Sequence, residues 1–179
     1  MKIFAETDRL ILRELLPSDA EGMYALDADP EVHRYLGHQP IEDRQQAMAA
    51  IQNVRRQYEE EGVGRWAMEE KATGSLVGWT GLKLVKTPMN GYVNYHDLGY
   101  RLRREYWGRG LAIESAWPAL AYGFEQLGLA TIYAAAHVDN IGSNRVLQKL
   151  GFQRKNAFYY QDLPCHWYAI TREAFLDSD

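Results

Sequence analysis

The sequence predicts a mixed α/β (α+β) domain in which one central sheet carries helices on both faces. Three observations predict this fold. Helical periodicity dominates the first third of the chain, strand-like runs joined by short turns fill the middle, and strands alternate with helices in the last third. Because no repeat and no linker-like stretch interrupts this order, a single domain over residues 1–179 is expected.

The bulk composition is that of a globular protein. Hydrophobic residues make up 46% of the chain and charged residues 25%, both ordinary shares for a packed domain. The formal net charge of −4 argues against a general affinity for nucleic acid. The single Cys165 excludes an internal disulfide, the five histidines lack metal-ligand spacing, and no metal is expected. No window approaches the roughly 20 apolar residues of a membrane helix, so we expect no membrane association and a cytoplasmic location.

The first third of the chain is predicted to hold one strand and two helices. Residues 9–14 are expected to form the strand. A helix should then begin with Ser18 as its N-cap and Glu21 as the capping-box partner. Residues 43–60 place apolar side chains at helical spacing, and Gly62 marks the end of that second helix.

Three consecutive strands are predicted in the middle of the chain. They are expected over residues 65–70, 75–84 and 92–102. The connections between them are short, and the first of these, residues 71–74, has the composition of a hairpin turn. Such connections cannot cross over to a parallel neighbour, so the three strands should be antiparallel.

The last third alternates helices with strands. A helix is predicted over residues 111–126, in which Pro118 removes one backbone hydrogen bond and should kink the helix near Glu114. The remaining elements, in order, are a strand over 130–137, a helix over 141–150, and strands over 153–160 and 166–170. This alternation completes the layered fold.

A glycine turn between a strand and a helix is the strongest chemical feature. Gly108 and Gly110 let the backbone approach a ligand closely, and the free N–H groups of the helix that follows point into the same space. Nearby arginines can add charge-assisted contacts, namely Arg103, Arg104 and Arg109. The turn is therefore suited to a pyrophosphate, although a tight turn without any ligand is the competing interpretation.

Two other phosphate-binding loops do not match. A dinucleotide-binding fingerprint needs a third glycine where this chain has Ile113, and antiparallel hairpins rather than a strand-helix-strand unit precede the turn. The Gly-Lys-Ser/Thr signature of a P-loop does not occur. A nucleoside triphosphate or dinucleotide site is therefore disfavoured.

Three segments together carry a family resemblance. They are Asp97-Leu98-Gly99-Tyr100 continued by Tyr106-Trp107-Gly108-Arg109-Gly110-Leu111-Ala112-Ile113-Glu114, then Val138-Asp139-Asn140-Ile141-Gly142-Ser143-Asn144-Arg145-Val146-Leu147, and Lys149-Leu150-Gly151-Phe152. In this order and spacing they resemble the GNAT superfamily of N-acetyltransferases. Within it, the sequence looks closest to the RimJ/RimL-like branch of ribosomal-protein N-terminal acetyltransferases. The resemblance covers nearly the whole chain.

The resemblance implies acetyl-coenzyme A as co-substrate and a mostly antiparallel, twisted sheet that is splayed at the cofactor site. Backbone amides from Gly108 to Ala112 would hold the pyrophosphate, the main chain of residues 100–102 would pair with the pantetheine arm, and Asn140 would bond to it. The cofactor-binding residues implied are Tyr100, Arg101, Leu102, Arg103, Gly108, Arg109, Gly110, Leu111, Ala112, Asn140 and Ser143. The chain departs from the family pattern at Glu105, where Arg or Gln is usual.

Catalysis by this family needs a group that takes a proton from the amine. Asp97 is the expected base, directly or through a water molecule, and Ser143 would protonate the leaving thiolate. Glu114 is the rival base, although a capping or ion-pairing role suits it better. Asn140 and Ser143 are also good helix-capping residues, and His96 is a reserve candidate.

The acceptor is expected to be a primary amine, first of all a protein or peptide N-terminus, attacked directly in a ternary complex. A small amine such as a polyamine, an amino acid or an antibiotic is the second candidate. A non-catalytic acyl-CoA-binding sensor is the alternative from a different class, because a fold alone does not define an activity. Many members of the family pair as dimers, so a homodimer is a further expectation.

Overall fold

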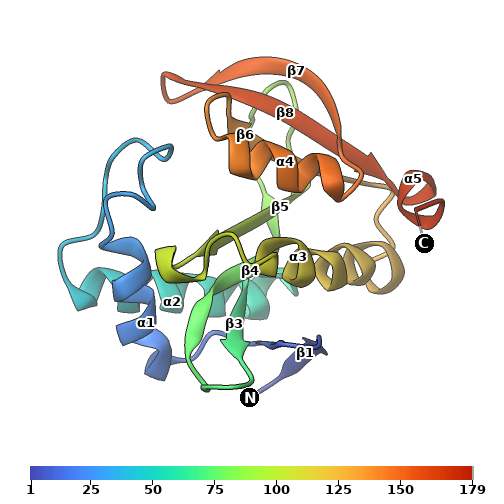
Figure 1. Cartoon of the computed structure of the whole chain (residues 1–179). Coiled ribbons are helices and arrows are strands. Elements are labelled where there is room, and N and C mark those ends of the chain that lie inside the picture. The colour runs from blue at the N-terminus through green and yellow to red at the C-terminus, as the bar shows by residue number, and fades with distance from the viewer. Residues whose placement is uncertain (179) are drawn as a thin grey trace.

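Eight strands form one sheet in the computed structural model, which describes residues 1–178 (Figure 1). Their order across the sheet is β1-β2-β3-β4-β5-β6-β8-β7. The strands are β1 (Ile3–Glu6), β2 (Leu10–Arg13), β3 (Trp66–Glu70), β4 (Leu76–Val85), β5 (Tyr95–Leu102), β6 (Thr131–His137), β7 (Gln153–Tyr160) and β8 (Leu163–Thr171). The α-helices are α1 (Ala20–Asp27), α2 (Arg44–Glu61), α3 (Leu111–Ala121), α4 (Ile141–Lys149) and α5 (Arg172–Leu176).

The sheet is antiparallel at every junction except one. The predicted antiparallel arrangement of β3, β4 and β5 is confirmed, with Lys83 opposite Asp97 in the long β4–β5 ladder. Strands β5 and β6 run parallel, and their register has the single pair Asp97 and Tyr133. Beyond Asp97, β5 continues to Leu102 without a further registered pair on β6. The sheet is therefore splayed between these two strands, as the family resemblance implied.

Helices cover both faces of the sheet, because alternate residues of its strands point to opposite sides. On β3, Trp66 and Met68 belong to the larger apolar core, which includes residues of α3 and α4. Ala67, between them, belongs to a second core formed with α1 and α2. Figure 1 shows α3 and α4 near each other on one face of the sheet. The expected arrangement of helices on both faces is confirmed.

Capping residues fix the ends of α2. Asp43 is the N-cap, and its side chain accepts a hydrogen bond from the Gln46 N–H. Gly62 ends the helix in the left-handed conformation, with φ of 70°. The predicted helix over residues 43–60 is therefore confirmed at both ends.

Several predicted boundaries were wrong for local reasons. Ser18 is not an N-cap, because it lies inside a 3₁₀ turn that precedes α1. The strand predicted from residue 92 begins at Tyr95, since Asn90 and Asn94 both have positive φ and keep the preceding loop out of the sheet. Strand β1 was not predicted at all. Among the helices of the described chain, none is both long and apolar enough to cross a membrane.

The helix that contains Pro118 differs from the prediction in where it deforms. It remains α-helical through Pro118 to Ala121, and residues 122–126 then form a π-helical turn. In that turn the Leu127 N–H donates to the Tyr122 carbonyl at 3.1 Å, five residues back. The widened turn comes after the proline, whereas the kink was expected before it, near Glu114.

Candidate active site

The splay between β5 and β6 is bridged on the α4 side by Tyr100. This residue is on β5, and its hydroxyl donates to the Ser143 carbonyl at 3.1 Å and lies 3.0 Å from the Ser143 hydroxyl. Burial raises the pKa of Tyr100, so its hydroxyl stays protonated at neutral pH. The part of β5 beyond Asp97, which has no registered pair on β6, thus lies next to a bonded pair of hydroxyls.

Asn140 fixes the first turn of α4 beside this pair. Its side-chain oxygen accepts the Ser143 N–H at 3.1 Å, so the predicted N-cap is confirmed. Asn144, one turn further, donates to the main-chain carbonyls of His137 and Asn140 and accepts from the Tyr168 hydroxyl at 2.6 Å. The buried Asn144 therefore links α4 to β6 and β8 and fixes the position of Ser143 relative to these strands.

The glycine turn has the backbone geometry of an anion cradle. Gly108 and Gly110 have φ of 72° and 77°, in the left-handed region that favours glycine. Gly110 is the N-cap of α3 and offers no side chain to its first turn. A Cβ built on Gly108 would meet no atom within 4 Å. The backbone is therefore open at Gly108, Arg9 Nη2 would lie 3.7 Å from a Cβ on Gly110, and the positive end of the α3 dipole lies at this turn.

The arginines around this turn are each paired with a carboxylate. Arg103 contacts Glu105 at 2.6 Å and donates to the Leu76 carbonyl, and Arg109 contacts Glu70 at 2.9 Å. The remaining two pairs are Arg104 with Asp29 and Arg101 with Asp27. The positive charge predicted for the turn is thus present but largely neutralised.

Two further residues predicted to bind cofactor have side chains that are buried in the protein. Leu102 and Leu111 have buried side chains in the larger core. The Leu102 carbonyl accepts the indole N–H of Trp107 at 2.8 Å, and the Ala112 carbonyl accepts the Ser115 hydroxyl. The backbone path from β5 into α3 is therefore fixed by core packing and by these local bonds.

Asp97 lies at the closed end of the splay, on the opposite face of the sheet from Tyr100. Its Oδ2 is 2.5 Å from Nη2 of Arg65, and the carboxylate is 22% exposed. Burial raises the pKa of Asp97, while the charge and hydrogen bond of Arg65 and the charge of Lys83 oppose that rise. A carboxyl group in this setting is held in one orientation and is available as a proton acceptor.

Glu114 has a structural environment instead. Its Oε1 accepts the Thr7 hydroxyl at 2.6 Å and the Arg9 N–H at 3.0 Å, and its Oε2 accepts Arg9 Nε at 2.7 Å. Burial alone would raise the pKa of Glu114, but these bonds from Thr7 and Arg9 outweigh it and lower the pKa below its usual value. Glu114 therefore ties α3 to the β1–β2 turn, which favours its structural interpretation.

Comparison with known proteins decides the family. A model of the acetyltransferase (GNAT) domain matches residues 9–153. The chain belongs to the GNAT family of acetyltransferases. The uncharacterized N-acetyltransferase YoaA of Bacillus subtilis is 36% identical over 160 residues, which cover 88% of each chain. The FsC-acetyl coenzyme A-N(2)-transacetylase of Aspergillus fumigatus is 29% identical over 182 residues, covering 95% of this chain and 77% of that protein.

Solved structures share this GNAT fold. The acetyltransferase (GNAT family) from Bacillus anthracis has a TM-score of 0.78 at 22% identity, with 97% of this chain and 99% of that one covered. RimL, a ribosomal L7/L12 alpha-N-protein acetyltransferase in complex with coenzyme A, has a TM-score of 0.78 at 16% identity, with the same coverage. Family and relatives make this protein an N-acetyltransferase, an acyltransferase of a family that uses acetyl-coenzyme A as donor.

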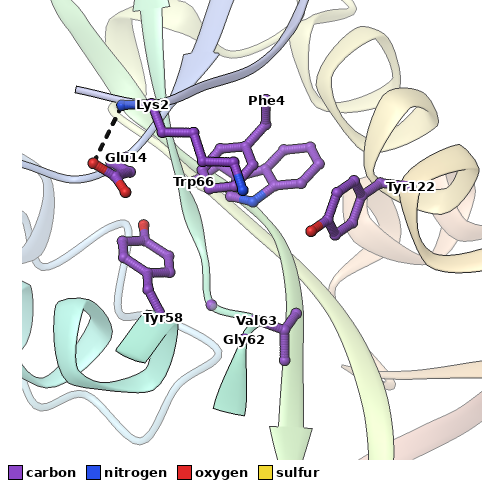
Figure 2. Close-up of a pocket in the computed structure, with 9 residues that line it drawn as sticks. Lys2, Phe4, Glu14, Tyr58, Gly62, Val63, Trp66 and Tyr122 are labelled. Atoms are coloured by element: carbon purple, nitrogen blue, oxygen red, sulfur yellow. Dashed lines mark hydrogen bonds between the residues drawn. The ribbon is translucent and has the colours of Figure 1, made fainter. Parts of the chain in front are cut away.

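An aromatic cavity of about 110 Å³ lies away from the splay (Figure 2). Figure 2 shows Phe4, Trp66 and Tyr122 around it, and the Phe4 and Trp66 rings stack with centroids 4.7 Å apart. Lys2 Nζ lies 4.9 Å from the Phe4 ring centroid. Trp66 points to the α3 side of β3. The cavity is therefore separate from Asp97, which faces the other side of the sheet.

Apart from the glycine turn at the start of α3 and the neighbouring arginines, the site residues named from the sequence lie on two sides of the splay. Tyr100, Asn140 and Ser143 meet on one side of the splay, and Asp97 lies at its end on the other side. Sequence analysis missed Arg65, which contacts Asp97 directly. A signal for it existed: glycines inside strands mark a close approach, and β4 carries two of them and β5 one.

Proposed function

We propose that this GNAT protein moves the acetyl group of acetyl-coenzyme A directly to a primary amine, within a ternary complex and without an acyl-enzyme. The observation that carries the proposal is the placement of Asp97 and of the Tyr100–Ser143 pair at the splay between β5 and β6. A proton acceptor and a proton donor then stand on opposite sides of the gap through which the donor arm would enter.

The residues fit the coenzyme at three places. The amides from Gly108 to Ala112 would hold the pyrophosphate, the free edge of β5 at residues 100–102 would pair with the pantetheine arm, and Asn140 would bond to that arm. The open space at Gly108 and the side-chain-free N-cap of α3 support the first assignment. The missing registered partner of β5 beyond Asp97 supports the second. When bound, acetyl-coenzyme A supplies the activated thioester.

Asp97 would accept the proton of the acceptor's ammonium group, directly or through water. The freed nitrogen lone pair then forms the N–C bond to the acetyl carbon while the C–S bond of that carbon breaks. The electron pair of the broken bond stays on sulfur. The Ser143 hydroxyl would give a proton to this sulfur, and its bond to Tyr100 holds it beside the splay. The second proton of the acylated nitrogen, lost as the amide forms, would restore the Ser143 hydroxyl directly or through water.

The first acceptor candidate is an N-terminal α-amine of a protein or peptide, as in the RimJ/RimL-like branch. The favouring argument is that the Asp97 carboxylate, even with its pKa raised by burial, is a far weaker base than an alkyl amine. At about pH 7.5, roughly a quarter of an α-amine with pKa near 8 is already neutral, against about one part in a thousand for an alkyl amine with pKa near 10.4. A carboxylate base therefore suits an α-amine better than an alkyl amine.

A small amine is the second candidate. The observation favouring it is the similarity to the FsC-acetyl coenzyme A-N(2)-transacetylase, which is closer in sequence than RimL, at 29% against 16% identity. The non-catalytic sensor is disfavoured because Asp97 and Ser143 are both present and both held in place.

The test is release of free thiol from acetyl-coenzyme A, measured with three acceptor panels. The first panel contains short peptides with free N-termini, the second the same peptides with blocked N-termini and an internal lysine, and the third small amines. Turnover on the first panel alone supports the α-amine assignment, and turnover on the third alone replaces it with a small acceptor. Coenzyme binding without turnover on any panel would contradict the proposed activity and support the sensor.

A further inference from the structure

We infer that Arg65 is a positioning residue for Asp97, fixing the direction and the charge of that carboxylate at the splay. This inference rests on the proposed function, in which Asp97 takes the proton of the amine. Arg65 lies just before β3, two strands away from Asp97, so its side chain must cross β4 to make the contact.

The guanidinium group of Arg65 is held against the sheet by several bonds. Nη2 donates to Asp97 Oδ2 at 2.5 Å, while Nη1 donates to the Asp97 carbonyl at 2.7 Å and to the Gly81 carbonyl. The planar fork of arginine allows these bonds at the same time, which a lysine could not match. With a side chain only 12% exposed, Arg65 is held in a single orientation.

Two strand glycines make room for this crossing. Gly81 on β4 and Gly99 on β5 are direct neighbours in the ladder. A Cβ built on Gly99 would lie 2.7 Å from Nη2 of Arg65, closer than any real contact. Trp79 closes the arrangement, because its ring lies 5.2 Å from Cζ of Arg65. The position of the guanidinium group therefore requires the absence of a side chain at Gly99, while Gly81 contributes its carbonyl as an acceptor.

The main chain of Arg65 is anchored from the opposite side. The Tyr58 hydroxyl donates to the Arg65 carbonyl and accepts the Leu15 N–H at 3.2 Å. Burial raises the pKa of Tyr58 to about 12, so this hydroxyl remains a donor throughout the working pH range. The backbone and the side chain of Arg65 are thus both fixed, and the bond from Arg65 restrains the Asp97 carboxylate in turn.

Arg65 also supplies the nearest opposite charge to Asp97. The other titratable groups near Asp97 are Lys83, its neighbour across the β4–β5 ladder, Tyr95 and Tyr100 on β5, and Tyr133, its partner on β6. Among the described contacts, none of these groups bonds to the Asp97 carboxylate, whereas Arg65 does. The ionised form of Asp97 therefore depends first on Arg65.

The experiment compares wild type with Arg65→Gln and Arg65→Lys in the full chain, using two readouts. Carbon-detected NMR follows the titration of the Asp97 side chain, and thiol release gives kcat/KM against pH. Removing an opposite charge at this distance raises a carboxyl pKa by about 1 to 3 pH units. In Arg65→Gln we expect this rise in the titration midpoint and an equal upward shift of the acid limb of kcat/KM.

Arg65→Lys should keep the midpoint near the wild-type value while lowering kcat, because the charge remains but the fork that orients Asp97 is lost. As a control, Arg101→Gln removes the other guanidinium group near Trp79 and should shift the Asp97 midpoint less. An unchanged midpoint in folded Arg65→Gln, or equal shifts in all three variants, would overturn the inference. The titration needs no turnover, so a wild type that acetylates no amine overturns the proposed function separately.

Discussion

Replacing Gly108 by alanine tests the backbone cradle separately from folding. Gly108 has φ of 72°, and a Cβ there would meet no atom within 4 Å. Without ligand, the Gly108→Ala substitution should therefore lower the free energy of unfolding only by the strain of an L-residue in the left-handed region, about 1–2 kcal/mol. Gly62 provides a matched control, with φ of 70° and the same open space at the end of α2. Both variants should lose similar stability.

Only the Gly108 variant should lose affinity for the coenzyme. Under the proposed function, the added Cβ would stand where the backbone must approach the pyrophosphate. The loss of one charge-assisted hydrogen bond costs about 1.5–3 kcal/mol. This corresponds to a roughly 10- to 100-fold rise in KM for acetyl-coenzyme A, or in Kd for coenzyme A. Gly62→Ala should leave both constants at wild-type values.

Three measurements decide the outcome. Thermal unfolding should show both variants lowered by about 2–8 °C, the shift expected for this strain in a domain of this size. Calorimetric titration with coenzyme A gives Kd without an acceptor, and thiol release gives KM where an acceptor is known. Unchanged Kd in a folded Gly108→Ala protein would refute the cradle, and equal losses in both variants would show that the effect is only strain.

Three other substitutions test neighbouring residues. Asp97→Asn should lower kcat/KM by about 10²- to 10⁴-fold, the usual contribution of a general base, and abolish the acid limb of the pH–rate profile; a profile that keeps this limb would exclude Asp97 as the base. Tyr100→Phe removes the hydroxyl bonded to Ser143 and should lower kcat about 5- to 10-fold with KM for acetyl-coenzyme A unchanged, measured by thiol release. Glu114→Gln should lower the free energy of unfolding by about 1–2 kcal/mol at pH 7 through its weakened bonds to Arg9. Because the folded-state pKa of Glu114 is lowered from 4.5, its stabilisation is fully present above pH 4.5 and disappears as the pH falls through the folded value. Urea titrations of both proteins at several pH values check this, and a difference that persists in acid would contradict it.

Local signals were enough to predict most elements of the sheet and of the helices. Asp43 and Gly62 bounded α2 correctly, because capping chemistry is written in a few adjacent residues. The prediction failed at Ser18 because the next residue, Asp19, fixes the local conformation instead. The Asp19 carboxylate accepts the Leu16 N–H and pairs with the buried Arg13. A contact from a separate strand decided that local structure, and periodicity contains no information about it.

Strand β1 was missed because pairing rather than pattern defines it. Its four residues alternate weakly, and their side chains are half-buried or exposed. The strand exists because it extends the edge of β2 and because Phe4 stacks on Trp66. Edge strands held by one neighbouring strand and by ring contacts from distant residues leave little trace in a single sequence.

The backbone features of the candidate site could be predicted from the sequence, whereas its ion pairs could not. The glycines of the turn and the cap at Asn140 follow from residue type and spacing. The crossing of Arg65 to Asp97 joins residues 32 positions apart and depends on the order of three strands. The glycines at 81 and 99 were visible in the sequence, but only the β4–β5 register shows that they face each other.

The ion pairs around the glycine turn change how its arginines should be understood. Glu105 replaces the basic or amide residue usual in the family, and this could be taken as the loss of a phosphate ligand. In the structure, Glu105 pairs with Arg103, while Glu70 pairs with Arg109. A bound pyrophosphate would have to compete with these carboxylates for either guanidinium group, so the net electrostatic gain from the arginines is small. The amides and dipole at the start of α3 have no such competitor, since Gly110 offers no capping side chain. Under the proposed function, the pyrophosphate would therefore be held mainly by the backbone, and this would explain why an acidic residue is tolerated three positions before the first glycine.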